Sequence, residues 1–172
     1  TSWAFNADLK NVHGDLDNAK ISLNKVEQGK DKQIILTTTP LFALLGEKIV
    51  QEWKQIGVNA VVRIESGMPQ NFQILLTSVP IPHDPDQYIL WHSTQEKTNL
   101  SRYSNPRVDK DLEDGRKIED QQKREEKYWD FQKILQDDVP ASFLYFPKIN
   151  VVLRQKVENN LNKILNIQIP QN

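Results

Sequence analysis

Histidine and carboxylate side chains are the first residues to consider for chemistry in this sequence. The three histidines, His13, His83 and His92, lie far apart and share no spacing typical of metal ligands. His83 directly precedes Asp84, but adjacent side chains seldom face each other, so an acid–base pair is not indicated. The sequence has no glycine-rich phosphate loop, no serine-centred nucleophile elbow and no HExxH motif. We therefore expect no catalytic residues, no metal site and no other cofactor.

A second group of side chains suits binding rather than catalysis. Amphipathic aromatic rings and amides fit a ligand groove that is mostly apolar and has a few polar anchors. Four residues of one stretch have this character, and they are Trp91, Ser93, Asn99 and Tyr103. The alternative for each of them is a role in packing or in capping a turn. Trp91 is the strongest candidate for a position near a ligand.

The stretch from Asp84 to Lys117 positions these four residues. It opens on Asp84–Pro85–Asp86, which predicts a turn because aspartate bonds its own backbone and proline restricts φ. Asn105 and Pro106 then predict a helix start, with asparagine as N-cap and proline at the first helical position. Helical spacing continues through Val108, Leu112 and Gly115. The candidates therefore lie in a loop between a turn and a helix, where binding residues are common.

The segments before this stretch predict a sheet. Residues 33–38 form an apolar, β-branched run, residues 58–65 alternate, and a helix over 41–56 with a wide apolar stripe separates them. This strand–helix–strand unit predicts a parallel pair with a right-handed crossover. Residues 72–79 predict a third strand, apolar enough to lie inside the sheet. We expect an α/β fold with a mostly parallel central sheet flanked by helices. Ligands in such sheets bind outside the carboxyl ends of the strands.

The remaining segments complete one predicted lobe over 1–172. Residues 1–14 are an irregular lead-in with Trp3 and Phe5 as anchors, and a helix over 15–28 is expected to end at Gly29. A helix over 120–137 places Tyr128, Phe131, Ile134 and Leu135 toward the core and Lys123 to Glu126 toward water. Residues 141–146 and 149–153 predict two strands, and 156–172 form a C-terminal tail.

Composition excludes several classes of partner. A chain of 172 residues can bury a sizeable core, and its formal net charge of −1 creates no field that favours nucleic acid or an anionic membrane. The absence of cysteine excludes disulfides and thiolate metal sites, and it is compatible with an oxidising compartment. No signal peptide and no apolar run of membrane-spanning length is evident.

Three blocks in order carry a family resemblance: DPDQYILWHSTQ, NLSRYSNPRVD and DQQKREEKYWDFQKILQDDVPASFLYF. Together they resemble the C-terminal lobe of the family 5 peptide/nickel solute-binding proteins, the receptors of oligopeptide and dipeptide ABC importers. The resemblance implies a periplasmic-binding-protein type II-like lobe, excised from a larger two-lobed protein. It implies a peptide or other small solute as ligand, with the N-terminal lobe and the ABC transporter permease subunits as partners. It also implies an extracytoplasmic location, with a lipid anchor through the missing N-terminus.

The same resemblance, aligned on the DPD turn, assigns ligand contacts to the end of the third strand at Ser78, Val79, Pro80 and Ile81. Receptors of this family often have an aspartate where Ile81 stands, to pair with the amino terminus of the peptide. Isoleucine cannot make that pair, and Pro80 and Pro82 lack the N–H donors that an added peptide strand would use. Recognition anchored on a free amine is therefore not expected. The alternative for Ile81 is that it faces the core.

Two other functions are considered. Lobes of this type also occur in transcription regulators as ligand-sensing domains, and sequence upstream of Thr1 would distinguish the two. A hydrolase would require an acid–base pair that the sequence does not show. Because a cleft ligand is buried by both lobes, we expect this lobe alone to bind small ligands weakly or not at all.

Overall fold

The computed structural model describes residues 2–9, 14–26, 32–81 and 84–146. The chain divides into two compact units, Thr1–Asp138 and Val139–Asn172, and all described helices and strands belong to the first. Among the described residues, no helix is long and apolar enough to cross a membrane. The elements along the chain are α1 (Leu16–Asn24), β1 (Ile34–Thr38), the 3-10 turn η1 (Pro40–Phe42), α2 (Ala43–Gln55), β2 (Ala60–Ile64), β3 (Ile74–Leu76), α3 (Tyr88–Trp91), α4 (Pro106–Lys117) and α5 (Gln121–Asp138).

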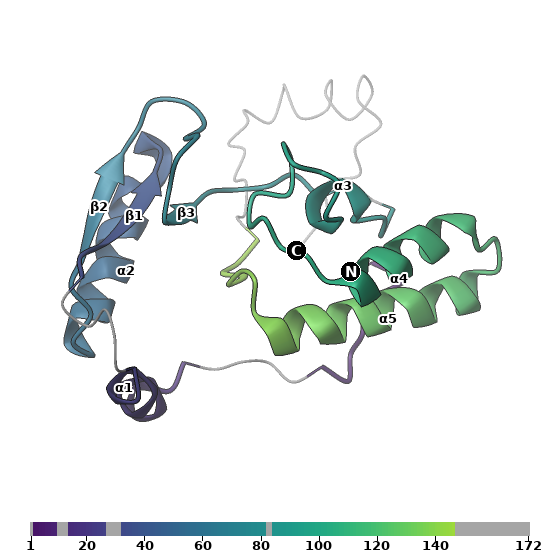
Figure 1. Cartoon of the computed structure of the whole chain (residues 1–172), viewed down its shortest axis with the longest axis horizontal. Coiled ribbons are helices and arrows are strands. Elements are labelled where there is room, and N and C mark those ends of the chain that lie inside the picture. Colours follow the sequence, from purple (N-terminus) through teal and green to yellow (C-terminus); the bar gives the residue numbers. More distant parts are fainter. Residues whose placement is uncertain (1, 10–13, 27–31, 82–83, 147–172) are drawn as a thin grey trace, which may run out of the picture. The chain divides into compact units, whose positions relative to one another are not determined.

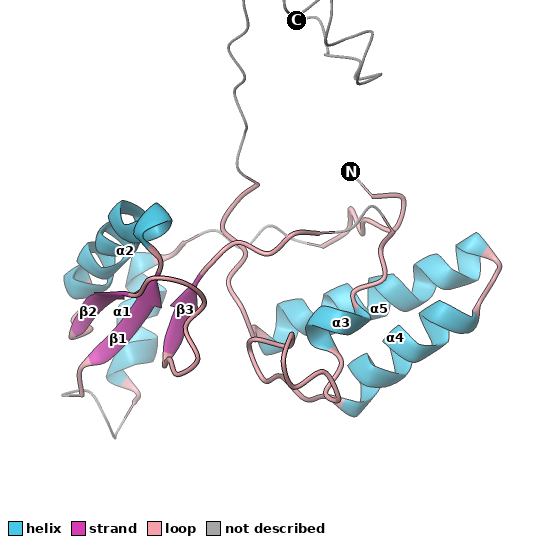
Figure 2. Cartoon of the chain, turned by 90° about the horizontal axis from the view of Figure 1, so that it is seen from above, coloured by secondary structure: helices cyan, strands magenta, loops and turns pink. Residues whose placement is uncertain are grey.

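The described strands form a parallel sheet with the order β2-β1-β3, which confirms the predicted α/β fold. The register aligns the carboxyl ends of the strands, because Thr38 lies opposite Ile64 on one side and Leu76 on the other. Helix α2 packs on one face of β1 and β2 (Figure 2). The sheet core consists of Leu36, Val50, Ala60 and Leu76.

Glycines at two positions shape α2, one at its contact with the sheet and one after its end. A Cβ at Gly46 would lie 3.2 Å from Leu36 Cδ2, so a side chain there would press the helix away from β1. Gly57 has a φ of +95° and follows the end of α2, as the sequence predicted. The helix start differs from the prediction of one helix over 41–56. The turn η1 comes first, and Leu41 and Leu44 are 82% and 83% exposed rather than part of the buried stripe.

The third strand is shorter than the predicted range of 72–79, and its place in the sheet differs from the prediction. Pairing with β1 covers Ile74 to Leu76 alone, and β3 is an edge strand of the described sheet rather than an interior one. Ile74 is accordingly 37% exposed. An apolar run therefore indicated a strand correctly but not its place in the sheet.

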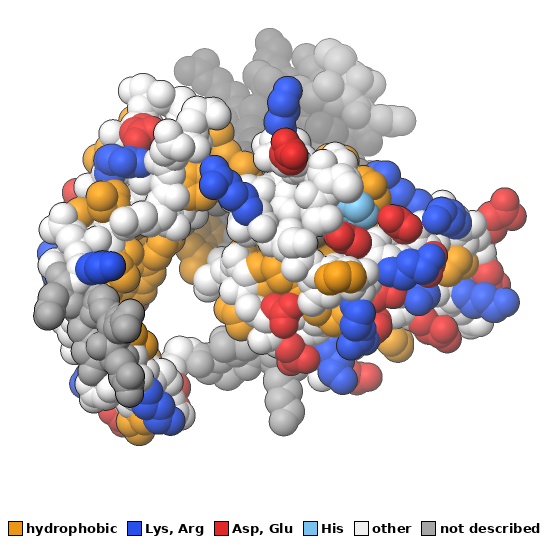
Figure 3. Space-filling model, in the orientation of Figure 1, with side chains coloured by type: hydrophobic (Ala, Val, Ile, Leu, Met, Phe, Trp, Pro, Cys, Tyr) orange, Lys and Arg blue, Asp and Glu red, His pale blue; other side chains and the backbone are white. Residues whose placement is uncertain are grey.

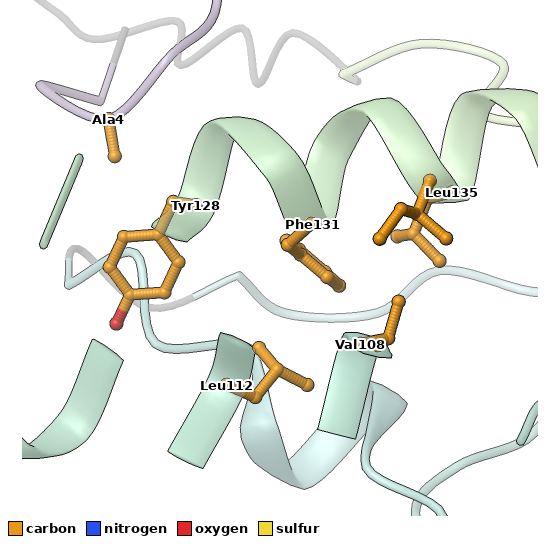
Figure 4. Close-up of a cluster of buried hydrophobic side chains, with 7 residues drawn as sticks. Ala4, Val108, Leu112, Tyr128, Phe131 and Leu135 are labelled. Carbon is orange, nitrogen blue, oxygen red and sulfur yellow. The ribbon is translucent and has the colours of Figure 1, made fainter. Parts of the chain in front are cut away.

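The helical part of the same unit has its own core. Helices α4 and α5 run side by side (Figures 1 and 2), and α3 packs against α4. This core contains the apolar face of α5 and the apolar positions of α4 that the sequence predicted, together with one residue from the N-terminal segment (Figure 4). Its members are Ala4, Val108, Leu112, Tyr128, Phe131, Ile134 and Leu135. Trp3 packs edge-on against Tyr128 with ring centroids 6.1 Å apart. Phe5, the other predicted anchor, is 56% exposed.

Three further predictions need correction. Helix α1 ends at Asn24, before Gly29, which lies outside the described residues. Residues 141–146 form no strand, and Phe143 to Phe146 are exposed. Arg124 does not face water with its neighbours, since its side chain is only 22% exposed. The predicted strand over 149–153 and the tail over 156–172 lie outside the described residues, and the extent of the lobe stays a prediction.

Candidate functional site

The candidate residues after β3 are accessible. Ser78 to Ile81 lie beyond the carboxyl end of β3, after Thr77, and all four residues are exposed. Val79 is 38% and Ile81 54% exposed, so Ile81 is not buried in the core of the described residues. The segment therefore lies where a parallel sheet offers side chains to a ligand.

Trp91 and Tyr103 come together in the helical part. Their rings meet edge to face with centroids 6.3 Å apart, and both pack partly buried against the helical core. The Tyr103 hydroxyl donates a hydrogen bond to the Asp138 carboxylate. Burial and this bond raise the pKa of Tyr103 to about 12. The hydroxyl therefore keeps its proton at neutral pH and donates it within the protein.

Ser93 follows α3 and is hydrogen-bonded to Asp109 of α4. Its backbone N–H donates to Asp109 Oδ1 at 2.8 Å, and its hydroxyl donates to Asp109 Oδ2 at 2.5 Å. Both donors of Ser93 are thus used within the protein. Its remaining capacity is as an acceptor, through the lone pairs of the hydroxyl oxygen.

Asn99 connects two segments of the loop through side-chain hydrogen bonds. It is 3% exposed, and its Nδ2 donates to the carbonyls of Tyr103 at 2.7 Å, Trp91 at 3.4 Å and His92 at 3.4 Å. Its Oδ1 accepts from the Tyr103 amide at 3.2 Å. One side chain thereby links the segment that carries Trp91 to the segment that carries Tyr103. The structural role that the sequence left open for Asn99 is the one observed.

We expect Asn99→Asp to lower the free energy of unfolding by about 2–3 kcal/mol, because a carboxylate cannot donate to three carbonyls and buried groups left unpaired cost about 1–3 kcal/mol each. Chemical denaturation measures the change. Asn59→Asp, at an exposed position before β2, is the matched control and should leave stability nearly unchanged. Equal effects of the two substitutions would contradict the role of Asn99.

The turn before α3 is held by ion pairs that sequence reasoning missed. The Asp84–Pro85–Asp86 turn forms the predicted Asx bond, from the Asp86 amide to Asp84 Oδ1 at 2.9 Å. Both oxygens of Asp84 also accept from the Arg124 guanidinium, at 2.7 and 3.1 Å, and this bond lowers the pKa of Asp84. Arg116 donates to Asp86 at 2.7 Å and lies 3.9 Å above the Tyr88 ring. No spacing signal could identify these partners, which are 40 and 30 residues apart.

A shallow hollow of about 390 Å³ lies on α4 and α5, away from the predicted residues. Each cation at its edge is paired: Arg107 with Asp130, Lys110 with Asp114, and Lys127 with Asp111. Figure 3 shows the same mixture of basic and acidic side chains over these helices. The hollow therefore has no unpaired charge with which to hold an anion.

The polar side chains of the loop around Asn99 are engaged within the protein. The described residues contain no group of three or more histidine or acidic side chains placed to hold a metal ion. The polar groups around Ser93, Asn99 and Tyr103 hold the loop in one conformation. Trp91 and Tyr103 are therefore the partly buried aromatic side chains that this loop holds against the helical core.

Comparison with solved structures identifies the fold. NikZ from Campylobacter jejuni, solved with Ni(L-His), matches at 23% identity and a TM-score of 0.71 over 81% of this chain and 33% of its own. The oligopeptide-binding protein AppA from Bacillus subtilis, solved with a nonapeptide, matches at 23% identity and a TM-score of 0.72 over 85% of this chain and 34% of its own. The chain has the fold of a lobe of the peptide/nickel ABC-transporter binding proteins.

The periplasmic binding protein DppA from Helicobacter pylori, solved with the peptide STSA, shares this lobe fold at 21% identity and a TM-score of 0.71 over 81% of this chain and 30% of its own. The present lobe thus spans about a third of the length of these structures. No protein-family model matches the sequence. No curated protein matches it either.

Proposed function

We propose that this chain is the C-terminal lobe of the substrate-binding component of an ABC importer, for peptides or a related small solute. The observation that carries the proposal is the agreement between the sequence resemblance and the described fold. The order of the three sequence blocks resembles that lobe, and the described fold matches about a third of three solved binding proteins. The chain acts by binding, and it performs no reaction.

The partners follow from this assignment. The N-terminal lobe of the same protein closes over the ligand, and the permease subunits of the transporter receive the loaded protein. The location is extracytoplasmic, with a lipid anchor in the preceding sequence. The sequence upstream of Thr1 tests this assignment. A lipoprotein signal supports the receptor, whereas a helix-turn-helix would overturn the proposal in favour of a regulator, which no described feature favours.

The ligand-binding residues of the proposal are Ser78, Val79, Ile81, Trp91, Ser93 and Tyr103. Exposure of residues 78–81 after β3 supports the first three. The Trp91–Tyr103 pair supplies an apolar surface, and Ser93 supplies a hydroxyl oxygen as acceptor. At residues 78–81 there is no charged side chain. This composition suits the uncharged part of a ligand, because an ammonium group buried without a carboxylate carries a large desolvation cost.

Ile81→Asp in the longer protein tests the role of this position. We expect it to improve the binding of peptides with a free amino terminus over their N-acetylated forms by about tenfold, the effect of one charge-assisted hydrogen bond. Competition binding with matched free and acetylated peptides measures the ratio. Ile21→Asp, at an isoleucine of α1 that is 51% exposed, is the control. An equal ratio of affinities for free and acetylated peptides in wild type and in Ile81→Asp would contradict a role for Ile81 in the binding site.

A further inference from the structure

A hydrogen bond joins the proposed binding residue Tyr103 to the end of a distant helix. Tyr103 lies in the loop before α4, and its hydroxyl donates to Asp138, the last residue of α5 and 35 residues later in the sequence. The same carboxylate oxygen of Asp138, Oδ2, accepts from Asn105 Nδ2 at 2.9 Å. The side-chain oxygen of Asn105 accepts from the Arg107 amide at 3.0 Å and so caps α4. One carboxylate therefore binds both the Tyr103 hydroxyl and the capping residue of α4.

The backbone and the side chain of Tyr103 are held by different residues. Asn99 binds the backbone, because its side chain accepts from the Tyr103 N–H and donates to the Tyr103 carbonyl. The phenol ring meets Trp91 edge to face, and its hydroxyl reaches Asp138. The bonds to Asn99 leave the side-chain torsions of Tyr103 undetermined. The direction of the ring therefore depends on its packing and on the bond to Asp138.

Helix preferences do not account for an acidic residue at the position of Asp138. The carboxyl end of a helix carries the negative end of its dipole, so an aspartate there is unfavourable, and the last turn of α5 has no basic residue. The pKa of Asp138 is nevertheless lowered, first by the hydrogen bond from Tyr103 and then by the one from Asn105. At neutral pH the carboxylate is therefore ionised and bound to these two donors.

Backbone strain adjoins both partners of this bond. Arg102, directly before Tyr103, has a φ of +53°, and Val139, directly after Asp138, has a φ of +48°; among the described residues no other non-glycine residue has a positive φ. Such a backbone is costly for a residue with a Cβ, most of all for a β-branched one, and persists only where surrounding contacts fix it. We propose that Asp138 is a positioning residue that fixes the ring of Tyr103 against Trp91 for ligand binding. The inference rests on the proposed function in treating Tyr103 as a binding residue.

NMR on the chain itself tests the position of the ring without a ligand. We expect Asp138→Ala to weaken the nuclear Overhauser contacts between the Trp91 and Tyr103 rings, because the hydroxyl loses its acceptor and the ring samples other rotamers. Asp138→Asn should keep these contacts, since its Oδ1 has two lone pairs with which to accept from Tyr103 and Asn105. Asp137→Ala is the matched control, because it removes the neighbouring exposed carboxylate of α5 and leaves the Tyr103–Asp138 bond in place.

Three results would overturn the inference. They are unchanged ring contacts in Asp138→Ala, an equal loss in Asp137→Ala, and an equal loss in Asp138→Asn, which would assign the effect to charge rather than to the acceptor. Tyr103→Phe removes the donor instead of the acceptor and should lose the same contacts with Trp91. Where Asp138→Ala does not fold, Tyr103→Phe decides in its place.

Peptide binding by the longer protein tests the consequence for function. Asp138→Ala and Tyr103→Phe should each weaken the affinity by about tenfold, because only a fraction of the molecules then holds the ring in place. The double variant should lose no more than either single variant, since both substitutions remove the same bond. Where wild type binds and the variants bind equally well, the inference fails and the proposed function stands. Where wild type binds no peptide, the proposed function fails and the ring contacts alone decide the inference.

Discussion

Leu112→Ala is expected to lower the free energy of unfolding by about 2–5 kcal/mol, the range for leucine truncation in a packed core. Leu112 is 0% exposed and lies between Val108, Phe131 and Tyr128 in the helical core (Figure 4). The substitution removes buried apolar surface and leaves a cavity that the surrounding rings cannot fill. Urea denaturation followed by circular dichroism measures the loss.

Leu41→Ala is the matched control for this prediction. Leu41 is 82% exposed, so the same truncation should change stability by no more than about 0.5 kcal/mol. The sequence alone would assign both leucines to apolar helix faces. Comparable losses for the two variants would show that Leu41 is covered in solution.

Arg124→Lys is expected to lower the free energy of unfolding by about 2 kcal/mol, because lysine retains the charge but loses the planar fork. Arg124 donates to both oxygens of Asp84, to the Gly115 carbonyl at 2.7 Å and to the Tyr128 hydroxyl at 3.1 Å. It therefore joins the turn before α3 to α4 and α5. Lysine has a single nitrogen with which to reach these three partners.

The pH dependence of this effect has a definite sign. Arg124 lowers the pKa of Asp84, so the stabilisation from this pair is present above the ordinary aspartate pKa of about 3.9 and is lost as pH falls through the lowered value. The difference in the free energy of unfolding between wild type and Arg124→Lys should therefore become smaller at acidic pH. Arg107→Lys is the control, because Arg107 pairs with Asp130 at 70% exposure and such surface pairs contribute about 0–1 kcal/mol. An equal loss in both variants would contradict the role of Arg124.

Local patterns predicted most of the fold. The β-branched run at 33–38 and the alternating run at 58–65 became β1 and β2, because both are rich in the β-branched residues that strands favour. Asn105 caps α4 through its side chain, with Pro106 at the first helical position, as predicted. The buried face of α5 also agrees with its helical periodicity.

Predictions that depend on distant partners were less successful. Leu41 and Leu44 fit an apolar stripe, yet Leu41 lies in the 3-10 turn before α2, Leu44 lies in the first turn of α2, and both are exposed outside the sheet core. Residues 141–146 are apolar enough for a strand, but a strand requires a pairing partner that composition does not reveal. In the candidate site, the Asx turn was predictable, whereas the Asn99 bonds and the Arg124–Asp84 pair arise only when the chain folds. The ligand contacts themselves stay predictions.

The bonds between the N-terminal segment and α5 have a consequence for synthesis. Gln132 donates to the Ala4 carbonyl and accepts from the Asn6 amide across 128 and 126 residues, whereas Thr38 reaches Leu76 of the neighbouring strand across 38. At about 5–20 residues per second, a ribosome needs roughly ten seconds to reach Gln132 after it has made the segment around Ala4. The sheet strands emerge complete in the meantime. The nascent chain can therefore pair its strands before α5 closes the helical core on Ala4 and Asn6.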